Sequence, residues 1–251
     1  MSYRFFTQST PNNGKIMLDG EQARHAIQVM RFGEGDQIVL FDGSGTEYVA
    51  LIDQVEKRRL WLSIKSQRVV PRGIKANITL AVALPKGDRQ KVLVEKLVEL
   101  GVERLIPLKS NRSVAVANQK VVQRLQKQVV EASKQCGRNR LMKIEGETTL
   151  GGLSEVLEAS VLKLIADPYQ GQAILDVAAK CLAEMPAEIV VAIGPEGGFD
   201  DEENLLSQEL GFQPVRLGPS ILRVETAAVA IAAILGIGLE TGQAESGELE
   251  V

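Results

Sequence analysis

Two stretches near the C-terminus decide the fold: IVVAIGPEGGF, residues 189–199, and VRLGPSILRVETAAVAIAAIL, residues 215–235. Each begins as a strand, passes through a Gly/Pro loop and ends in a helix. Strands and helices alternate in this way from residue 78 onward, which predicts an α/β fold with a mostly parallel sheet. Ligands in such sheets bind at the carboxyl ends of the strands. We therefore expect the two loops to form a ligand site, side by side if their strands are neighbours.

The first 70 residues show a different sequence pattern. Apolar and polar residues alternate, and the turn signal DGSG at 42–45 interrupts them, which predicts a small β-barrel. A short helix is expected over residues 21–31. A linker is expected over residues 69–77, so the predicted domains are 1–72 and 73–251. The polar tail, TGQAESGELEV, is expected to fray.

Composition excludes several classes of protein. The N-terminus lacks the apolar segment of a signal peptide, and the apolar run 227–239 is too short to cross a bilayer. Cys136 and Cys181 are too few for a disulfide framework or a zinc site, and they indicate a reducing cytoplasm. His25 is the one histidine, and no nucleophile motif accompanies it. We expect a cytoplasmic protein without a metal.

Charge is divided unevenly along the chain. Residues 76–145 hold 14 basic and 6 acidic side chains, a net charge of +8, whereas residues 146–251 have a net charge of −14. Residues 1–75 have a net charge of +3. The basic part could bind a polyanion, although helix surfaces can also differ in charge without any binding partner.

The GPEGG loop does not suit a phosphate. No Lys-Ser/Thr pair follows it, and four acidic residues, 200–203, begin the next helix. Like charges about 4 Å apart cost roughly 1 to 4 kcal/mol per pair. A neutral or cationic adenosine derivative fits better, with S-adenosylmethionine as the obvious example. A tight turn without a ligand remains an alternative.

The second loop adds side chains that could do chemistry. Arg223 and Glu225 flank Val224 at the start of a helix, so both could approach a site there. A helix cap with a local salt bridge would account for the same residues.

These residues resemble a known family. The chain is similar to the RNA methyltransferases of the SPOUT superfamily, and specifically to those that methylate N3 of a uridine in 16S ribosomal RNA. HAIQVMRFGEGD (25–36) and DGSG (42–45) resemble its N-terminal PUA-like barrel. EKLVELGVERLIPL (95–108) and EASKQCGR (131–138) resemble its central signatures, and IGPEGGF and LGPSILRVETA its cofactor loops. Pro219 stands where many members carry a basic residue.

The resemblance implies a SPOUT domain with a deep trefoil knot, a bent S-adenosylmethionine in the knot, and a homodimer with the active site at its interface. It also implies a substrate, uridine 1498 of 16S ribosomal RNA in the small subunit. The expected cofactor-binding residues are Ile193, Gly194, Pro195, Glu196, Gly197, Gly198, Leu217, Gly218, Ile221, Leu222, Thr226 and Ala227.

Methylation at N3 requires loss of the N3 proton, so a general base or a stabiliser of the developing anion is needed. Glu225 is the candidate base, and Arg223 could stabilise the anion or position a phosphate. Arg138 is the third catalytic candidate, unless it serves only as a cation at a helix C-terminus. The candidate RNA contacts are His25, Arg31, Gln135 and Arg138, with a structural role as the alternative for His25.

Three other functions stay open at this point. The chain could be a SPOUT methyltransferase that acts on tRNA or on a ribose 2′-hydroxyl. It could be an RNA-binding module without catalysis, although the intact GPEGG and LRVETA loops argue against that. An ATP-dependent enzyme would have to tolerate the acidic run 200–203 beside its phosphates.

Overall fold

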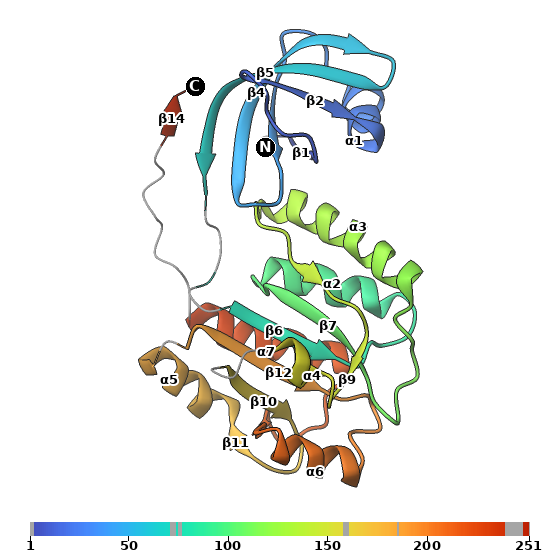
Figure 1. The fold of residues 1–251 in the computed structure, drawn as a ribbon, viewed down its shortest axis with the longest axis vertical. Helices are drawn as coiled ribbons and strands as arrows, with labels where there is room; N and C mark the ends of the chain where they lie inside the picture. Colours follow the sequence, from blue (N-terminus) through green and yellow to red (C-terminus); the bar gives the residue numbers. More distant parts are fainter. Residues whose placement is uncertain are drawn as a thin grey trace. The chain divides into compact units, whose positions relative to one another are not determined.

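The computed structural model describes residues 3–70, 74, 77–157, 161–184, 186–238 and 248–250 (Figure 1). Contacts divide the chain into two compact units. The N-terminal unit comprises residues 1–72, 133–141 and 242–251, and the C-terminal unit comprises 73–132 and 142–241. The N-terminal unit thus includes two segments outside the predicted 1–72 domain. One of them holds the last residues of helix α3 (Gln119–Cys136).

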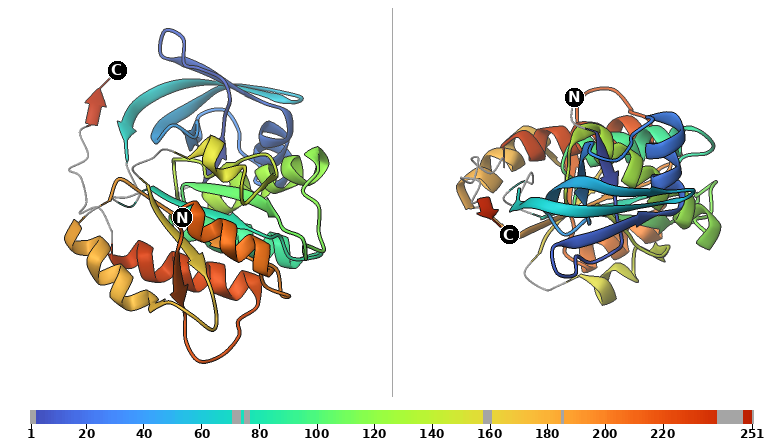
Figure 2. Two further views of the ribbon diagram at one scale, coloured as in Figure 1. Left: turned by 60° about the horizontal axis from the view of Figure 1, so that its bottom comes forward. Right: turned by 90° about the horizontal axis from the view of Figure 1, so that it is seen from above.

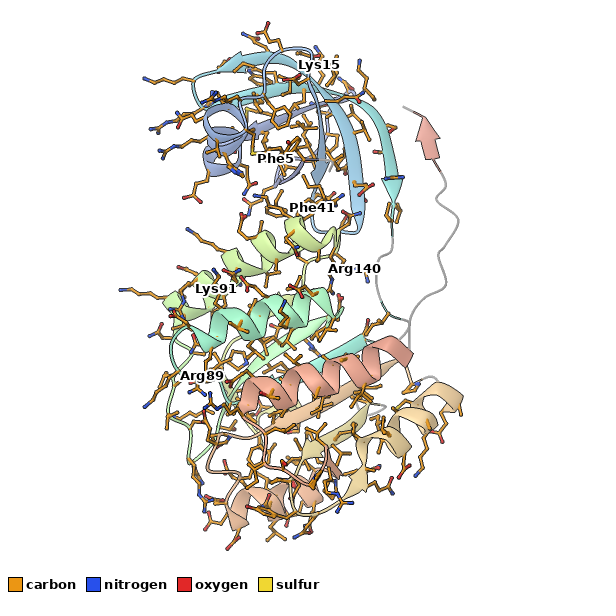
Figure 3. All side chains as sticks on the ribbon, turned by 180° about the vertical axis from the view of Figure 1, so that it is seen from behind. Phe5, Lys15, Phe41, Arg89, Lys91 and Arg140 are labelled. Atoms are coloured by element: carbon orange, nitrogen blue, oxygen red, sulfur yellow. The ribbon has the colours of Figure 1, made fainter. Side chains whose placement is uncertain are left out.

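A six-stranded sheet forms the N-terminal unit, in the order β1-β3-β4-β5-β14 with β2 also paired to β5. Alternate side chains point into one apolar core, which includes Phe5, Leu18, Leu40 and Leu62; Figure 3 labels Phe5. The strands are β1 (Arg4–Phe6), β2 (Lys15–Asp19), β3 (Gln37–Phe41), β4 (Thr46–Glu56), β5 (Arg59–Val69) and β14 (Glu248–Glu250).

Two sequence-based expectations for this unit were wrong in part. The helix expected over 21–31 is an α-helix, α1 (Gly20–Arg24), followed by a π-helical turn, η1 (His25–Val29). It ends before Arg31, whose φ of 59° is left-handed and incompatible with a continuing helix. In the tail that was expected to fray, Glu248–Glu250 pairs antiparallel with β5. Most of the expected linker, 71–73 and 75–76, lies outside the described residues.

The α/β fold predicted for the C-terminal unit is confirmed. Its sheet is parallel, in the order β11-β13-β10-β12-β6-β7-β8, with β9 also paired to β7. The strands are β6 (Asn77–Val82), β7 (Arg104–Lys109), β8 (Lys143–Ile144), β9 (Thr148–Thr149), β10 (Leu162–Ala166), β11 (Gln172–Ala173), β12 (Glu188–Ile193) and β13 (Gln213–Arg216). The trefoil knot stays a prediction.

Helices cover both faces of this sheet, which explains why nearly every residue of its central strands β6 and β12 is buried. Helices α2, α5 and α7 pack together, with α7 against β6 and β12; Figure 2 shows α5 and α7 side by side. The other face buries Ile106, Val190 and Phe212. The helices are α2 (Arg89–Glu99), α4 (Leu153–Val156), α5 (Ile174–Glu184), α6 (Asp201–Glu209) and α7 (Val224–Gly238).

Strand order corrects one expectation about the site. β12 and β13, which lead into the two Gly/Pro loops, are not neighbours, because β10 lies between them and pairs with both. Strand order depends on long-range pairing, which local sequence patterns do not encode. Within the described ranges, every helix is too short or too polar to span a lipid bilayer.

Candidate functional site

A cavity of about 440 Å³ opens at the carboxyl ends of β10, β12 and β13. Three loops line it: residues 166–170 after β10, 194–199 after β12 and 217–222 after β13. Side chains of α6, the first residues of α7 and Arg112, in the loop after β7, complete the wall. Its volume lies in the range of about 300 to 1,000 Å³ that is typical of small-molecule sites.

The GPEGG loop is held by the start of α6. Asp200 caps this helix: its side chain accepts from the Glu203 amide at 2.9 Å, and Glu203 accepts from the Asp200 amide at 3.0 Å. The Glu203 N–H, helped by Asn111, lowers the pKa of Asp200. The acidic run therefore begins and caps α6, as its position predicted. The capping box formed by Asp200 and Glu203 orients the chain where the GPEGG loop enters the helix.

The loop after β13 leads into α7. Gly218 has a φ of 153°, and no heavy atom lies within 4 Å of the position where a Cβ would stand. Val224 is buried, whereas the neighbouring Arg223 is exposed. The Ala227 amide donates to the Arg223 carbonyl at 2.9 Å and starts the helix. Leu217, Gly218, Ser220, Ile221 and Leu222 of this loop line the cavity.

Sequence reasoning missed the loop after β10. Asp167 Oδ1 accepts from the amides of Tyr169 and Gln170, at 2.7 and 3.1 Å. Gly171 has a φ of 98°, and a Cβ there would lie 2.1 Å from the Pro214 carbonyl oxygen. The signal was present in the sequence ADPYQG, an Asp-Pro turn with a glycine directly after a strand.

Most of the predicted cofactor residues line this one cavity, and Thr226 alone among them does not. It lies exposed on α7. The residues that line the cavity are Ile193, Gly194, Pro195, Glu196, Gly197, Gly198, Leu217, Gly218, Ile221, Leu222 and Ala227.

The lining fits an adenosine derivative better than a nucleotide phosphate. Ile165, Val215 and Leu222 give an apolar surface for a flat base, and three loops offer backbone donors and acceptors. Asp167 and Glu196 are acidic, and Arg112 is the one cationic side chain among the described lining residues. This composition suits a ligand that carries positive charge and a single carboxylate, as S-adenosylmethionine does. In the described residues there is also no group of three or more His, Cys, Asp or Glu that could hold a metal ion.

Glu225, a catalytic candidate at the start of α7, is mostly buried and lies beside a cation. Its side chain is 14% exposed and lies 3.5 Å from Arg89 Nη1, which is also 3.0 Å from Glu196 Oε1. Its Oε2 atom is buried and has no hydrogen-bond partner among the described residues. Arg89, at the start of α2 (Figure 3), was not predicted as a site residue because it precedes Glu196 by 107 positions.

The four candidate RNA contacts belong to the N-terminal unit and differ in exposure. Arg31 and Gln135 are exposed. His25 is half-buried and lies edge-on to Phe5, with 6.0 Å between ring centres, which favours the structural role. Arg138, also a catalytic candidate, is only 4% exposed.

A buried ionic cluster explains why the 133–141 segment belongs to this unit. Glu47, 1% exposed, accepts hydrogen bonds from Arg4, Arg68 and Asn139. Burial alone would raise the pKa of Glu47, but these hydrogen bonds outweigh it and lower the pKa to about 2. Both strand β4 and the segment after α3 are fixed through this one carboxylate.

Known proteins share both units. The family profile of an RNA methyltransferase domain matches residues 73–236, and that of an RNA methyltransferase PUA domain matches residues 18–65. Ribosomal RNA small subunit methyltransferase E of Synechocystis is 33% identical over 87% of this chain and 72% of its own.

Two solved structures have the same fold over nearly their whole length. A Legionella pneumophila protein with bound SAM has a TM-score of 0.83 and 31% identity, covering 94% of this chain and 97% of its own. A ribosomal RNA small subunit methyltransferase E from Neisseria gonorrhoeae, bound to S-adenosylmethionine, has a TM-score of 0.83 and 31% identity, covering 93% and 96%. The resemblance read from the cofactor loops is thereby confirmed, and the chain belongs to the RNA methyltransferase family that includes ribosomal RNA small subunit methyltransferase E.

Proposed function

We propose that this protein transfers the methyl group of S-adenosylmethionine to N3 of a uridine in 16S ribosomal RNA of the small subunit, at uridine 1498. The convergence of three strand-end loops on one cavity with an apolar wall and acidic side chains carries the proposal. The solved relatives that bind S-adenosylmethionine support it. Bound S-adenosylmethionine supplies an activated methyl group on a cationic sulfur.

The protein's own contribution is positioning and proton transfer. The target uridine leaves its stack, at a cost of a few kcal/mol, to reach the site. Glu225 accepts the N3 proton, since its carboxylate is mostly buried and has an oxygen without a hydrogen-bond partner among the described residues. Arg89 holds that carboxylate in place. Arg223, exposed beside it in the sequence, stabilises the uridine anion or a neighbouring phosphate.

The basic part of the chain is proposed to bind the RNA. Arg31 and Gln135 are exposed on the N-terminal unit and are proposed to contact the RNA. We also propose a homodimer. The small apolar residues Val229, Ala230 and Ala233 are only partly buried on α7 and suit close packing against a second copy.

The direct test is methylation of purified small subunits that lack the modification. The protein is incubated with labelled S-adenosylmethionine and subunits, with free 16S RNA and unmodified tRNA in parallel. The products are digested to nucleosides and identified by mass. 3-Methyluridine in the subunit reaction supports the proposal. Methylation of tRNA alone, or of a ribose hydroxyl, would replace it with another activity of the superfamily. Light scattering of the same preparation tests the homodimer.

A further inference from the structure

One side chain of the cavity wall, Arg112, comes from the loop that follows β7. It is the one cation among the described residues that line the cavity. S-adenosylmethionine carries one anionic group, the carboxylate of its methionyl part. We propose that Arg112 recognises this carboxylate and so selects for a cofactor with an intact amino-acid end; the inference rests on the proposed function.

Arg112 is exposed, and one hydrogen bond and a packing contact orient it against the GPEGG loop. Its Nη1 donates to the Gly197 carbonyl at 2.7 Å. The arginine stem lies directly against Gly197, where a Cβ would come within 3.3 Å of the Arg112 Cδ atom. The glycine therefore permits the close approach of the arginine to the GPEGG loop.

Neighbouring residues fix the backbone that carries this arginine. The Asn111 amide donates to Glu203 at 3.0 Å, and its side chain donates to Asp200 at 2.7 Å. Ser110 and Ser113 close a turn around it, because the Ser113 amide donates to the Ser110 carbonyl at 3.0 Å. A guanidinium placed in this way loses little conformational freedom on binding, which favours affinity.

The chemistry of the guanidinium matches a carboxylate. It has five N–H donors in a fixed plane, and the Gly197 carbonyl accepts from one of them. A carboxylate can take two parallel hydrogen bonds from such a group. The acidic lining residues, Asp167 and Glu196, would repel the carboxylate and attract the ammonium and sulfonium groups instead. The wall thus offers one place for the negative end of the ligand.

Binding of two cofactors tests the inference. Calorimetry measures the dissociation constants of S-adenosylmethionine and of decarboxylated S-adenosylmethionine, which lacks only the carboxylate. In Arg112→Gln we expect S-adenosylmethionine to bind about 10- to 100-fold more weakly, and the decarboxylated compound to change less than about threefold. Arg112→Lys, which keeps the charge but not the planar pair of donors, should fall between. Arg216→Gln removes an exposed arginine of the same unit outside the lining and should leave both constants unchanged.

The results that contradict the inference differ from those that contradict the proposed function. Equal weakening for both compounds would mean that Arg112 only supports the GPEGG loop, and it would overturn the inference while leaving the proposed function intact. No change for either compound would overturn it too. A wild-type protein that binds neither compound would overturn the proposed function, and this inference with it. Circular dichroism and thermal melting check that each variant folds.

Discussion

Arg89 Nη1 lies 3.5 Å from Glu225 Oε2, so the candidate base is paired with a cation at the start of α2. The same guanidinium atom lies 3.0 Å from Glu196 in the GPEGG loop. One arginine therefore joins the first cofactor loop to the helix that follows the second. This link gives Glu225 a fixed orientation, and it also connects the position of the base to the state of the cofactor loop.

Glu225→Gln should lower the rate of methyl transfer by about 10²- to 10⁴-fold, because the amide cannot accept the N3 proton. The affinity for S-adenosylmethionine should change little, since Glu225 does not line the cavity. The measurement is a single-turnover rate on small subunits with saturating cofactor. Glu202→Gln, on the exposed side of α6, is the matched control. A Glu225→Gln enzyme with the wild-type rate would remove the residue from the mechanism.

Arg89→Gln should reduce the same rate by about tenfold, the loss expected when a charged hydrogen-bonding group is removed. Arg89→Lys should restore part of it, because the positive charge returns without the planar geometry. The double variant with Glu225→Gln distinguishes the two roles. If Arg89 acts through Glu225, the second substitution adds little to the first. If instead the double variant loses rate by the product of the two single losses, Arg89 acts on the RNA or on the cofactor loop and not through Glu225.

The fold was predictable where local patterns determine it. Gly101 and Gly137 follow the ends of α2 and α3 with a φ of 80°, the left-handed conformation in which glycine commonly ends a helix, and the alternation of strands and helices from residue 78 onward marked the parallel sheet. The site was predictable only in part, because partners far apart in the sequence meet there. Arg112 donates to Gly197, 85 positions away, and no periodicity signals that contact.

The same limit applies to the surroundings of Arg138. The sequence offered it as a catalytic and RNA-contact candidate, or as a cation at a helix C-terminus, within the predicted C-terminal domain. In the structure the segment 133–141 belongs to the N-terminal unit, with Asn139 bonded to Glu47 across 92 positions. Burial of Arg138 follows from that long-range packing, which the local sequence does not contain.

Gly171→Ala should destabilise the loop after β10. The new Cβ would lie 2.1 Å from the Pro214 carbonyl oxygen, and the φ of 98° disfavours any side chain. We expect a loss of about 1 to 3 kcal/mol in the free energy of unfolding of the C-terminal unit, and weaker cofactor binding. Urea unfolding and calorimetry measure the two effects. Gly146→Ala, with no heavy atom within 4 Å, is the control; equal effects of both substitutions would refute the steric argument.

Glu47→Gln should cost about 3 to 5 kcal/mol of unfolding free energy at neutral pH, because it leaves Arg4 and Arg68 without their buried countercharge. The folded-state pKa of Glu47, about 2, is below its usual 4.5, so the stabilisation is fully present above pH 4.5 and is lost as the pH falls towards 2. The difference in unfolding free energy between the wild type and Glu47→Gln should therefore shrink as the pH falls from 4.5 towards 2. Denaturant unfolding at several pH values, with the exposed Glu21→Gln as control, measures it. A constant difference down to pH 2 would contradict the assignment.

Arg31→Gln should weaken binding of 16S RNA and reduce the slope of log K against log salt by about 0.7 to 0.9, the value for one lost phosphate contact. Gln135→Ala carries no charge difference and should leave the slope unchanged. His25→Ala should lower stability rather than the slope, since the ring packs against Phe5. Arg31→Gly separates charge from backbone strain: it removes the same charge but relieves the left-handed φ of 59°. Filter binding over a salt series would show equal slope losses for the Gln and Gly variants if the charge contacts phosphate, and a wild-type slope in both if Arg31 only shapes the turn after η1.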